Sequence, residues 1–283
     1  NSDQKELGIE QLGRRADRVL AEPFRRNTAP CIAYGTFRIL VENQNALIAV
    51  TPADHHIVRE DNFGLLIRQA FDFVGKNDAL LTIGITPDKP ETGYGYIKAD
   101  TKGRIDGFDN FRKVEAFTEK PDIKLAKVFL ESGDYYWNSG IFFWSINTIL
   151  NAFERYLPDI YNDFNYARDL FGTEIEDSFI AKSYESCQNI SIDCGIIEKA
   201  DNVYVAFSEI GCSDLGTWSS LYDHSAFDDN GNALIGGKVL SYENKGNIVR
   251  IPADKVAMIQ RLNDYIIVAT DEDLLIIKKA EEQ

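Results

Sequence analysis

The chain has 283 residues, of which 44% are hydrophobic, so it is long enough to bury one large core and a second, smaller one. Its formal net charge of −15 argues against a nucleic-acid backbone or an anionic membrane as a partner, and no apolar run approaches membrane-spanning length. The cysteines (Cys31, Cys187, Cys194 and Cys212) form no CxxC pair and do not cluster with histidine, which favours free thiols in a reducing compartment over disulfides.

The N-terminal part of the chain alternates between helix-like and strand-like patterns. Apolar residues recur at helical spacing in two segments and form continuous runs in two others. A strand, a helix and a strand of these lengths predict a βαβ unit with a parallel sheet. The predicted elements are a surface helix ending near residue 18, a short strand over 18–23, a turn-rich loop over 24–30, a helix over 29–43 with Thr28 as its N-cap, a strand over 46–54, a helix over 59–77 and a strand over 79–86.

The pattern continues to about residue 222 and then changes. Beyond Asp223, turns such as DDNGN, GGK and ENKGN separate short β-rich runs, with no helix of note and no visible repeat of solenoid period. This shift predicts a small β-rich C-terminal domain. The elements expected before it are a loop over 87–95, short alternating strands within 94–100 and 113–122, a helix over 123–133, a buried strand over 136–146, a long helix over 146–164, a polar helical stretch over 165–190, and a strand over 202–210 followed by a loop over 211–223.

Two aspartates follow apolar runs, at positions where open α/β sheets usually bind ligands. Asp54 ends the strand of 46–54 and precedes two of the three histidines, and Asp214 lies in a glycine-containing loop. Asp54 alone is compatible with a cap on the following helix, and Asp214 with a turn residue. Two carboxylates at one sheet edge are also what Mg²⁺ needs, because this ion takes one or two carboxylates and completes its shell with water and phosphate.

Two loops combine charged or aromatic residues with residues that shape the backbone. In PETGYGYI, Gly93 and Gly95 flank Tyr94, which fits either a hairpin turn or a loop whose backbone approaches a ligand closely. In TEKPD, Glu119 and Lys120 precede a proline. This second motif fits a solvated charge pair at the start of a helix, and on generic grounds that reading is the simpler one.

Polar residues also interrupt a buried strand. Asn138 and Ser139 lie within the aromatic run YWNSGIFFW, where they need hydrogen-bond partners; a bound sugar and the backbone are both candidates. The RRNTAP segment offers amide, hydroxyl and guanidinium groups before a helix, which suits an anion or a base edge. The sequence has no GxGxxG or GxxxxGK[ST] motif, which argues against a nicotinamide dehydrogenase and a P-loop kinase, and it has no GxSxG motif of a hydrolase.

Six blocks, taken in order, carry a specific resemblance. EPFRRNTAP, TPADHHI, PETGYGYI, FTEKPD, YWNSGIFFW and CSDLGTW closely resemble the mannose-1-phosphate guanylyltransferases (GDP-mannose pyrophosphorylases) of the sugar-nucleotidyltransferase superfamily. The similarity extends from about residue 19 to the C-terminus. It implies an α/β fold: a Rossmann-like nucleotidyltransferase core with a mostly parallel mixed sheet over residues 1–222, followed by a small β-rich C-terminal domain over 223–283.

The resemblance also implies a reaction and the residues of its site. GMP would be transferred from GTP to mannose 1-phosphate with release of pyrophosphate, supplying GDP-mannose in the cytoplasm. Asp54 and Asp214 would coordinate the catalytic Mg²⁺, and Lys120 would contact the sugar phosphate. The C-terminal domain would support a homodimer. The residues implied for the sugar are Tyr94, Gly95, Glu119, Asn138 and Ser139, and those implied for the nucleotide are Asn27, Thr28 and Pro30.

One part of the family pattern is not found in the chain. The family begins with a strand and a glycine-rich loop that binds the triphosphate through backbone N–H groups, with a lysine shortly after it. The chain is expected to start in the helix after the family's second strand, which favours an incompletely represented protein over natural loss of the loop. Two alternatives stay open: transfer to another sugar 1-phosphate, such as that of glucose or fucose, and a non-catalytic regulatory subunit that binds a sugar nucleotide. Both aspartates are present, which favours an enzyme.

Overall fold

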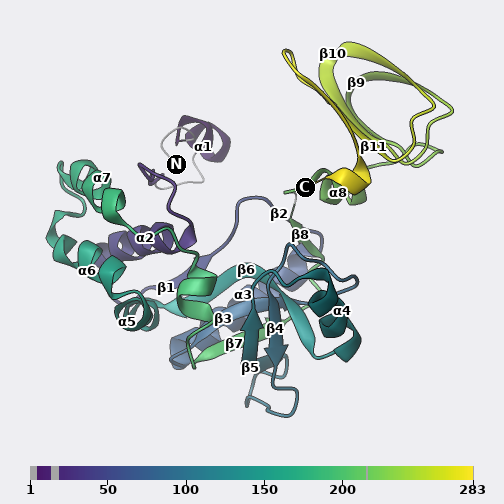
Figure 1. Ribbon diagram of the computed structural model, residues 1–283. Helices are drawn as coiled ribbons and strands as arrows, with labels where there is room; N and C mark the ends of the chain where they lie inside the picture. The colour runs from purple at the N-terminus through teal and green to yellow at the C-terminus, as the bar shows by residue number, and fades with distance from the viewer. Residues whose placement is uncertain (1–4, 14–18, 215, 283) are drawn as a thin grey trace. The chain divides into compact units, whose positions relative to one another are not determined.

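The computed structural model describes residues 5–13, 19–214 and 216–282 (Figure 1). Contacts divide the chain into a core unit, Asn1–Pro52 with Arg59–Ile210, and a C-terminal unit, Ala53–Val58 with Gly211–Gln283. The segment 53–58 belongs to the C-terminal unit because its strand pairs with a strand that follows Gly211. The contacts therefore change at Ile210, and the domain boundary after residue 222 stays a prediction.

A mixed sheet of six described strands forms the centre of the core unit, in the order β1-β6-β3-β7-β5-β4. β3 and β7 are parallel neighbours, and the other neighbouring pairs of these strands are antiparallel. β3 and β6 have nearly continuous buried runs, as expected for strands covered on both faces. The strands are β1 (Leu47–Val50), β3 (Leu80–Ile85), β4 (Tyr96–Ala99), β5 (Phe111–Thr118), β6 (Tyr135–Ser145) and β7 (Val203–Phe207).

The mixed α/β sheet predicted from the sequence is confirmed, but the neighbours within it differ from a simple βαβ unit. β1 and β3 run parallel, since both are antiparallel to β6, and β6 lies between them. Of the described strands of this sheet, β1, β3, β4 and β7 point the same way. A local hydrophobic pattern predicts where a strand lies, and it carries no information on which other strand will join it.

Helices cover both faces of the sheet (Figure 1). On one face, Phe71 of α3 packs edge to face on Phe143 of β6, with ring centroids 5.4 Å apart. On the other face, Trp144 of β6 belongs to a core shared with α2, α5 and α6. Successive strand residues point to opposite faces, so β6 contributes to both layers. The helices are α1 (Lys5–Leu12), α2 (Thr28–Glu42), α3 (Glu60–Lys76), α4 (Ile123–Ser132), α5 (Ile146–Tyr156), α6 (Pro158–Tyr166) and α7 (Glu176–Ser186).

Two sequence-based elements of the core unit are wrong. The long helix expected over 146–164 is two helices, because Pro158 lacks an N–H group and disfavours a helical conformation of Leu157, whose φ and ψ are −136° and 58°. The short strand expected over 18–23 is absent from residues 19–23, which pair with no other strand. The surface helix near the N-terminus is described over Lys5–Leu12, and residues 14–18 lie outside the described part.

The C-terminal unit contains a two-stranded ribbon, a short helix and a four-stranded sheet of order β12-β11-β10-β9. β9, β10 and β11 are parallel neighbours although only short turns connect them, so the chain winds in successive rungs like a solenoid. The sequence analysis did not foresee this winding. The elements are β2 (His55–Ile57), β8 (Cys212–Asp214), α8 (Trp218–Asp223), β9 (Ala233–Tyr242), β10 (Ile248–Gln260), β11 (Tyr265–Ala269), β12 (Leu274–Lys278) and a 3₁₀ turn (Lys279–Glu281).

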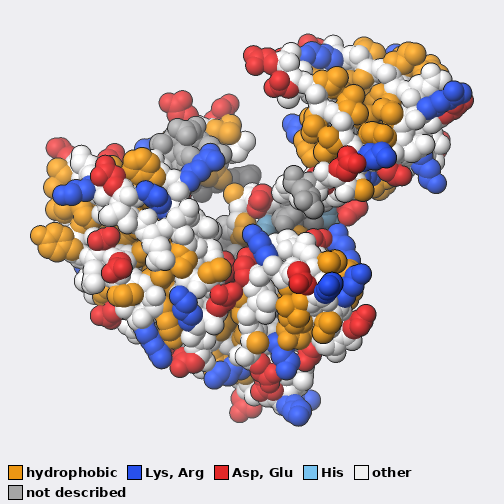
Figure 2. Space-filling model, in the orientation of Figure 1, with side chains coloured by type: hydrophobic (Ala, Val, Ile, Leu, Met, Phe, Trp, Pro, Cys, Tyr) orange, Lys and Arg blue, Asp and Glu red, His pale blue; other side chains and the backbone are white. Residues whose placement is uncertain are grey.

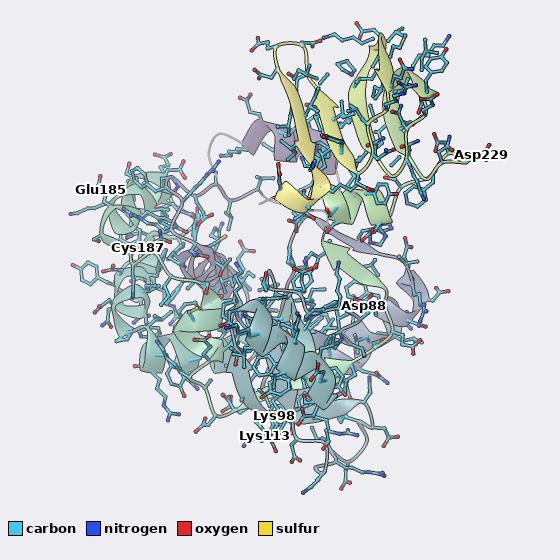
Figure 3. The ribbon with its side chains drawn as sticks, turned by 45° about the vertical axis from the view of Figure 1, so that its right-hand side comes forward. Asp88, Lys98, Lys113, Glu185, Cys187 and Asp229 are labelled. Carbon is cyan, nitrogen blue, oxygen red and sulfur yellow. The ribbon has the colours of Figure 1, made fainter. Side chains whose placement is uncertain are left out.

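Buried asparagines hold the turns between these rungs. Asn232 and Asn247 are each 1% exposed. Asn232 Oδ1 accepts hydrogen bonds from the backbone and side-chain N–H groups of Asn247, both at 3.0 Å, and Asn247 Oδ1 accepts from Tyr265 N at 2.9 Å. Each amide thus satisfies the backbone of the next turn, as a buried polar group must. Asp229, at the tip of the first turn, points outward in Figure 3.

The surface and the thiols bear on three further expectations. Figure 2 shows hydrophobic side chains gathered on the visible face of the C-terminal unit. Among the exposed hydrophobic residues of this unit, Val256 and Met258 are 65% and 69% exposed. Exposed hydrophobic patches are typical of association surfaces, and self-association stays a prediction.

Cys31, Cys187 and Cys194 are free, as predicted, and the side chain of Cys212 lies outside the described part. No described helix has the length and apolar composition of a membrane span.

Candidate functional site

Asn138 lies at the centre of a polar cluster in the core unit. It occupies the middle of β6 and is only 8% exposed. Its Oδ1 accepts a hydrogen bond from Thr82 Oγ1 at 2.8 Å, and its Nδ2 donates to Asp193 Oδ1 at 2.8 Å. Its backbone N donates to Gly95 O at 2.8 Å. Because the Thr82 hydroxyl donates to the oxygen and the Asp193 carboxylate accepts from the nitrogen, the two contacts fix the orientation of the amide.

Asp193 was not singled out from the sequence, and its position follows from an unusual backbone turn. Residues Asp193–Ile197 form a π-helical turn, a feature often found at functional sites. Ser191 Oγ accepts from Cys194 N at 3.1 Å and holds the start of this turn. A Cβ atom on Gly195 would lie 2.8 Å from the side chain of Leu157, so glycine allows the turn to pack against the core. The signal in the sequence is a lone carboxylate inside the apolar run ISIDCGII.

Glu119 reaches the same cluster because residue 95 is a glycine. A Cβ atom at Gly95 would lie 2.6 Å from Glu119 Oε2 and 3.0 Å from the ring of Phe117. At Gly95 the glycine therefore admits the carboxylate of Glu119, and a close approach of this loop to a ligand stays a prediction. Lys120 takes the left-handed backbone conformation, with φ at 42°, and its Nζ lies 3.8 Å from Glu119 Oε1. The side chain of Lys120 is 64% exposed and that of Glu119 is 24% exposed. The expectation of a solvated charge pair therefore fits Lys120 and does not fit Glu119.

The two carboxylates of the cluster are held in an environment that disfavours their charge. Burial raises the pKa of Glu119, and the negative charge of Asp193 raises it further, while Lys120 lowers it. Burial also raises the pKa of Asp193, against the hydrogen bond from Asn138. The two carboxylates have acceptor positions beyond the one on Asp193 that Asn138 occupies, and hydroxyl groups are suitable donors to them. The cluster is therefore chemically suited to a polyol.

Tyr94 and Ser139 are the two other residues expected in the sugar pocket. In the sequence, Tyr94 precedes Gly95 and Ser139 follows Asn138. The ring of Tyr94 packs on that of Trp137, with centroids 5.2 Å apart. Ser139 is 6% exposed, and its Oγ accepts from Ile141 N at 3.2 Å, which leaves the hydroxyl proton able to donate. The Nε1 of Trp137 is buried, and no hydrogen-bond partner for it is found among the described residues.

The RRNTAP segment begins α2 and lies against the turn that carries Asp193. Asn27 is the N-cap, with φ at 68° and its side chain accepting from Thr28 N, so the prediction that Thr28 is the cap is wrong. Thr28 Oγ1 instead accepts from Ile192 N at 2.8 Å, which brings it next to Asp193 in the chain. The amide of Asn27 caps the helix better because it combines an oxygen acceptor with tolerance of a positive φ. Pro30 is buried in the first turn of the helix.

Asp54 and Asp214 lie together in the C-terminal unit. In the ribbon of β2 and β8, His55 is paired with Asp214, so Asp54 comes one residue before the partner of Asp214. Asp54 is exposed. Its alternative role as a helix cap is wrong, because α3 begins at Glu60 after Arg59 as its N-cap, with no side-chain cap. The two aspartates therefore occupy neighbouring backbone positions, as a shared role requires.

The predicted residues thus fall into two groups, each within one unit. In the core unit, Asn138 donates hydrogen bonds to Gly95 and Asp193, Glu119 lies against Gly95, and Thr28 contacts the residue before Asp193. In the C-terminal unit, Asp54 and Asp214 are joined by the ribbon of β2 and β8.

Comparisons with known proteins identify the family of the chain. Residues 3–231 match the family model described as nucleotidyl transferase. Mannose-1-phosphate guanylyltransferase 2 of Escherichia coli O157:H7 is 33% identical over 281 residues, covering 97% of this chain and 58% of that protein. The alginate biosynthesis protein AlgA of Pseudomonas aeruginosa is 32% identical over 283 residues, covering 99% of this chain and 57% of that protein. The chain thus spans less than two thirds of the length of these curated relatives.

A solved structure gives the same result for the fold. The crystal structure described as a mannose-1-phosphate geranyltransferase from Thermus thermophilus is similar with a TM-score of 0.83 and 25% identity, covering 96% of this chain and 77% of that one. The family model covers more than half of the chain, and the mixed sheet is that of the similar structure. The chain belongs to the nucleotidyl transferase family.

Proposed function

We propose that the protein transfers GMP from GTP to mannose 1-phosphate, giving GDP-mannose and pyrophosphate. The observation that carries the proposal is the cluster of Glu119, Asn138 and Asp193, in which two partly buried carboxylates share a site with an oriented amide. Sugar hydroxyl groups would donate to these carboxylates and relieve the cost of their burial. The names of the relatives in Escherichia coli support mannose 1-phosphate as the sugar and guanylyl as the transferred group.

Other residues of the core unit would bind the remaining parts of the two substrates. Lys120 is exposed next to Glu119, so its ammonium group is available to the phosphate of the sugar. Tyr94, Gly95 and Ser139 would line the sugar. The nucleotide would contact the start of α2, with Asn27, Thr28 and Pro30 near the guanine and the ribose.

Asp54 and Asp214 fit a magnesium ion by their chemistry. Mg²⁺ keeps several waters and takes one or two carboxylates together with substrate phosphates. Two neighbouring aspartates can therefore supply all the ligands that the protein needs to contribute. No group of three or more His, Cys, Asp or Glu side chains that could enclose a metal occurs among the side chains the structure describes. When bound, Mg²⁺ would neutralise charge on the substrate phosphates.

The proposed chemistry needs no nucleophilic side chain. A phosphate oxygen of mannose 1-phosphate would attack the α-phosphorus of GTP, the bond between that phosphorus and the bridging oxygen would break, and pyrophosphate would leave in line with the attack. The protein would contribute position and charge: Lys120 on the sugar phosphate, the cluster of Glu119, Asn138 and Asp193 on the sugar ring, and the two aspartates on the metal.

Substitution of the two aspartates tests this assignment. Asp54→Asn and Asp214→Asn should each lower turnover roughly a hundredfold or more, since several kcal/mol of charge stabilisation is lost and each 1.36 kcal/mol is tenfold. The double variant should be scarcely worse than either single one, because residues that act on one ion are strongly non-additive. Asp229→Asn makes the same change at an exposed turn of the C-terminal unit and serves as the control. Near-normal turnover of Asp54→Asn at saturating Mg²⁺ would remove Asp54 from the site.

A further inference from the structure

The segment after the last strand of the C-terminal unit carries a carboxylate that binds the start of α8. Glu282 Oε1 accepts a hydrogen bond from Trp218 N, and Oε2 accepts from Ser219 N at 3.1 Å and from the Ser219 hydroxyl at 2.5 Å. The first N–H groups of a helix have no partner within the helix, and a negative charge there is favourable. Glu282, which is more than 60 residues later in the sequence, therefore fixes the first turn of α8.

The same segment makes a second contact on α8. The Lys279 ammonium group lies over the ring of Tyr222, 2.9 Å from its centroid, and Lys279 N donates to Asp264 O at 2.8 Å. The Tyr222 hydroxyl donates to Gly231 O at 2.6 Å, at the turn that starts the first rung. The helix is thus held between residues 279–282 and the turns of the solenoid.

On its other side, α8 adjoins the ribbon that carries the two aspartates. Asp214 ends β8, and only residues 215–217 separate it from the first residue of α8. At the far end of the helix, the ring of His224, the C-cap, packs edge to face on the ring of His56 at 5.3 Å. His56 belongs to β2 and lies two residues after Asp54. The helix is therefore connected to one strand by the chain and to the other by a ring contact.

We propose that Glu282 is a positioning residue for the pair Asp54 and Asp214. By capping α8, it fixes the helix that follows Asp214 and that contacts the strand of Asp54, and so it holds the two aspartates at their neighbouring backbone positions in the ribbon. The inference rests on the proposed function in one respect, namely that these aspartates bind a divalent metal. A purely structural cap would stabilise the C-terminal unit without changing the affinity of the folded protein for that metal.

The test compares Glu282→Ala with Glu281→Ala in the 283-residue chain. Glu281 is the exposed neighbour, and no hydrogen bond or ion pair of its side chain occurs in the part of the chain that the structure describes, so the control makes the same change in charge without touching α8. The primary measurement is Mn²⁺ binding by electron paramagnetic resonance, with Mn²⁺ alone as the probe. Glu282→Ala should weaken Mn²⁺ binding about tenfold, which corresponds to about 1.4 kcal/mol of binding free energy, and Glu281→Ala should weaken it less than about twofold.

Two further measurements keep the test decisive. Glu282→Gln keeps the shape and the hydrogen-bond oxygen, so it should fold even where the alanine variant does not, and it should show an intermediate affinity. Hydrogen–deuterium exchange should speed up at the amides of Trp218 and Ser219 in both Glu282 variants and be unchanged in Glu281→Ala, which shows whether the cap has been lost.

Each outcome decides the question. Equal Mn²⁺ affinity in the Glu282 and Glu281 variants overturns the proposal, and so does a loss of binding that merely follows the loss of folded protein. Unchanged Mn²⁺ binding in Asp54→Asn would also overturn it, because there would then be no metal pair to position. If Mn²⁺ binding behaves as expected but no GDP-mannose forms from GTP and mannose 1-phosphate, the proposed function fails and the positioning role stands.

Discussion

Thr82 offers the sharpest test of how the sugar cluster is organised. The side chain is fully buried on β3, and its hydroxyl lies 2.8 Å from Asn138 Oδ1 and 3.1 Å from Ile141 O. Thr82→Val keeps the shape and removes the hydroxyl that orients the amide, leaving Asn138 Oδ1 with a long contact of 3.3 Å from Gly140 N. A buried acceptor without its donor costs about 1–3 kcal/mol, and one added buried methyl group offsets about 0.8 kcal/mol of this. We expect a net loss of about 1 kcal/mol.

The functional effect should exceed the effect on stability. Without the Thr82 hydroxyl, the amide of Asn138 is held only by its donation to Asp193 and by the long contact from Gly140 N, so its position in the cluster is less well fixed. The affinity for mannose 1-phosphate should fall about tenfold, while the melting temperature should fall by only about 2–4 °C. Isothermal titration and thermal unfolding measure the two effects.

Thr36 supplies the matched control. Its hydroxyl is also buried, but no hydrogen-bond partner for it is found among the described residues. Thr36→Val should leave sugar-phosphate affinity unchanged and should stabilise the protein slightly, because it removes an unpaired polar group. In a double-mutant cycle, Thr82→Val and Asn138→Ala should be coupled by about 1 kcal/mol. Strictly additive effects of these two substitutions would refute the reasoning.

Three other substitutions are expected to act as follows. Gly95→Ala should weaken mannose 1-phosphate binding, because its Cβ would lie 2.6 Å from Glu119 Oε2; titration of the variant measures this. The raised pKa of Asp193 means that the folded state binds its proton more tightly than the unfolded state does, so stability falls as pH rises from the unfolded pKa through the folded one. Asp193→Asn should therefore flatten the fall in stability that urea unfolding measures as the pH rises above about 4, the unfolded pKa of an aspartate, while abolishing sugar-phosphate binding. Asn232→Ala leaves two N–H groups of Asn247 without an acceptor, and it should destabilise the C-terminal unit by about 2–4 kcal/mol in the same unfolding assay.

The sequence predicts the elements of the core unit well, because each depends on a local pattern. The apolar run of β3 and the helical period of α3 are visible without knowledge of any partner. The order of the strands could not be predicted in this way. β6 lies between β1 and β3 because of packing between segments that are far apart in the chain. Pro158 shows that a single residue can override a helical period.

The residues of the candidate site also divide into those that the sequence indicates and those whose position depends on the fold. Asn138 was visible as a polar residue in apolar surroundings, and Glu119 was assigned to the sugar by the family resemblance. Asp193 was missed because its position depends on a π-helical turn that no spacing rule predicts. The winding of the C-terminal unit was missed because its turns are irregularly spaced. Asn232 and Asn247 are 15 residues apart, and Asn247 and Tyr265 are 18 apart, so the rungs have no constant period in the sequence.

Product formation by the full-length gene product tests the proposed function most directly. The full-length protein is incubated with GTP, Mg²⁺ and either mannose 1-phosphate or glucose 1-phosphate, and the sugar nucleotide and pyrophosphate are quantified, with Asp54→Asn as the inactive reference. We expect GDP-mannose and pyrophosphate in equal amounts, with mannose 1-phosphate clearly preferred. Preference for glucose 1-phosphate would contradict the assignment of the sugar, and tight binding of GDP-mannose without any pyrophosphate release would contradict catalysis and indicate a regulatory sugar-nucleotide-binding protein.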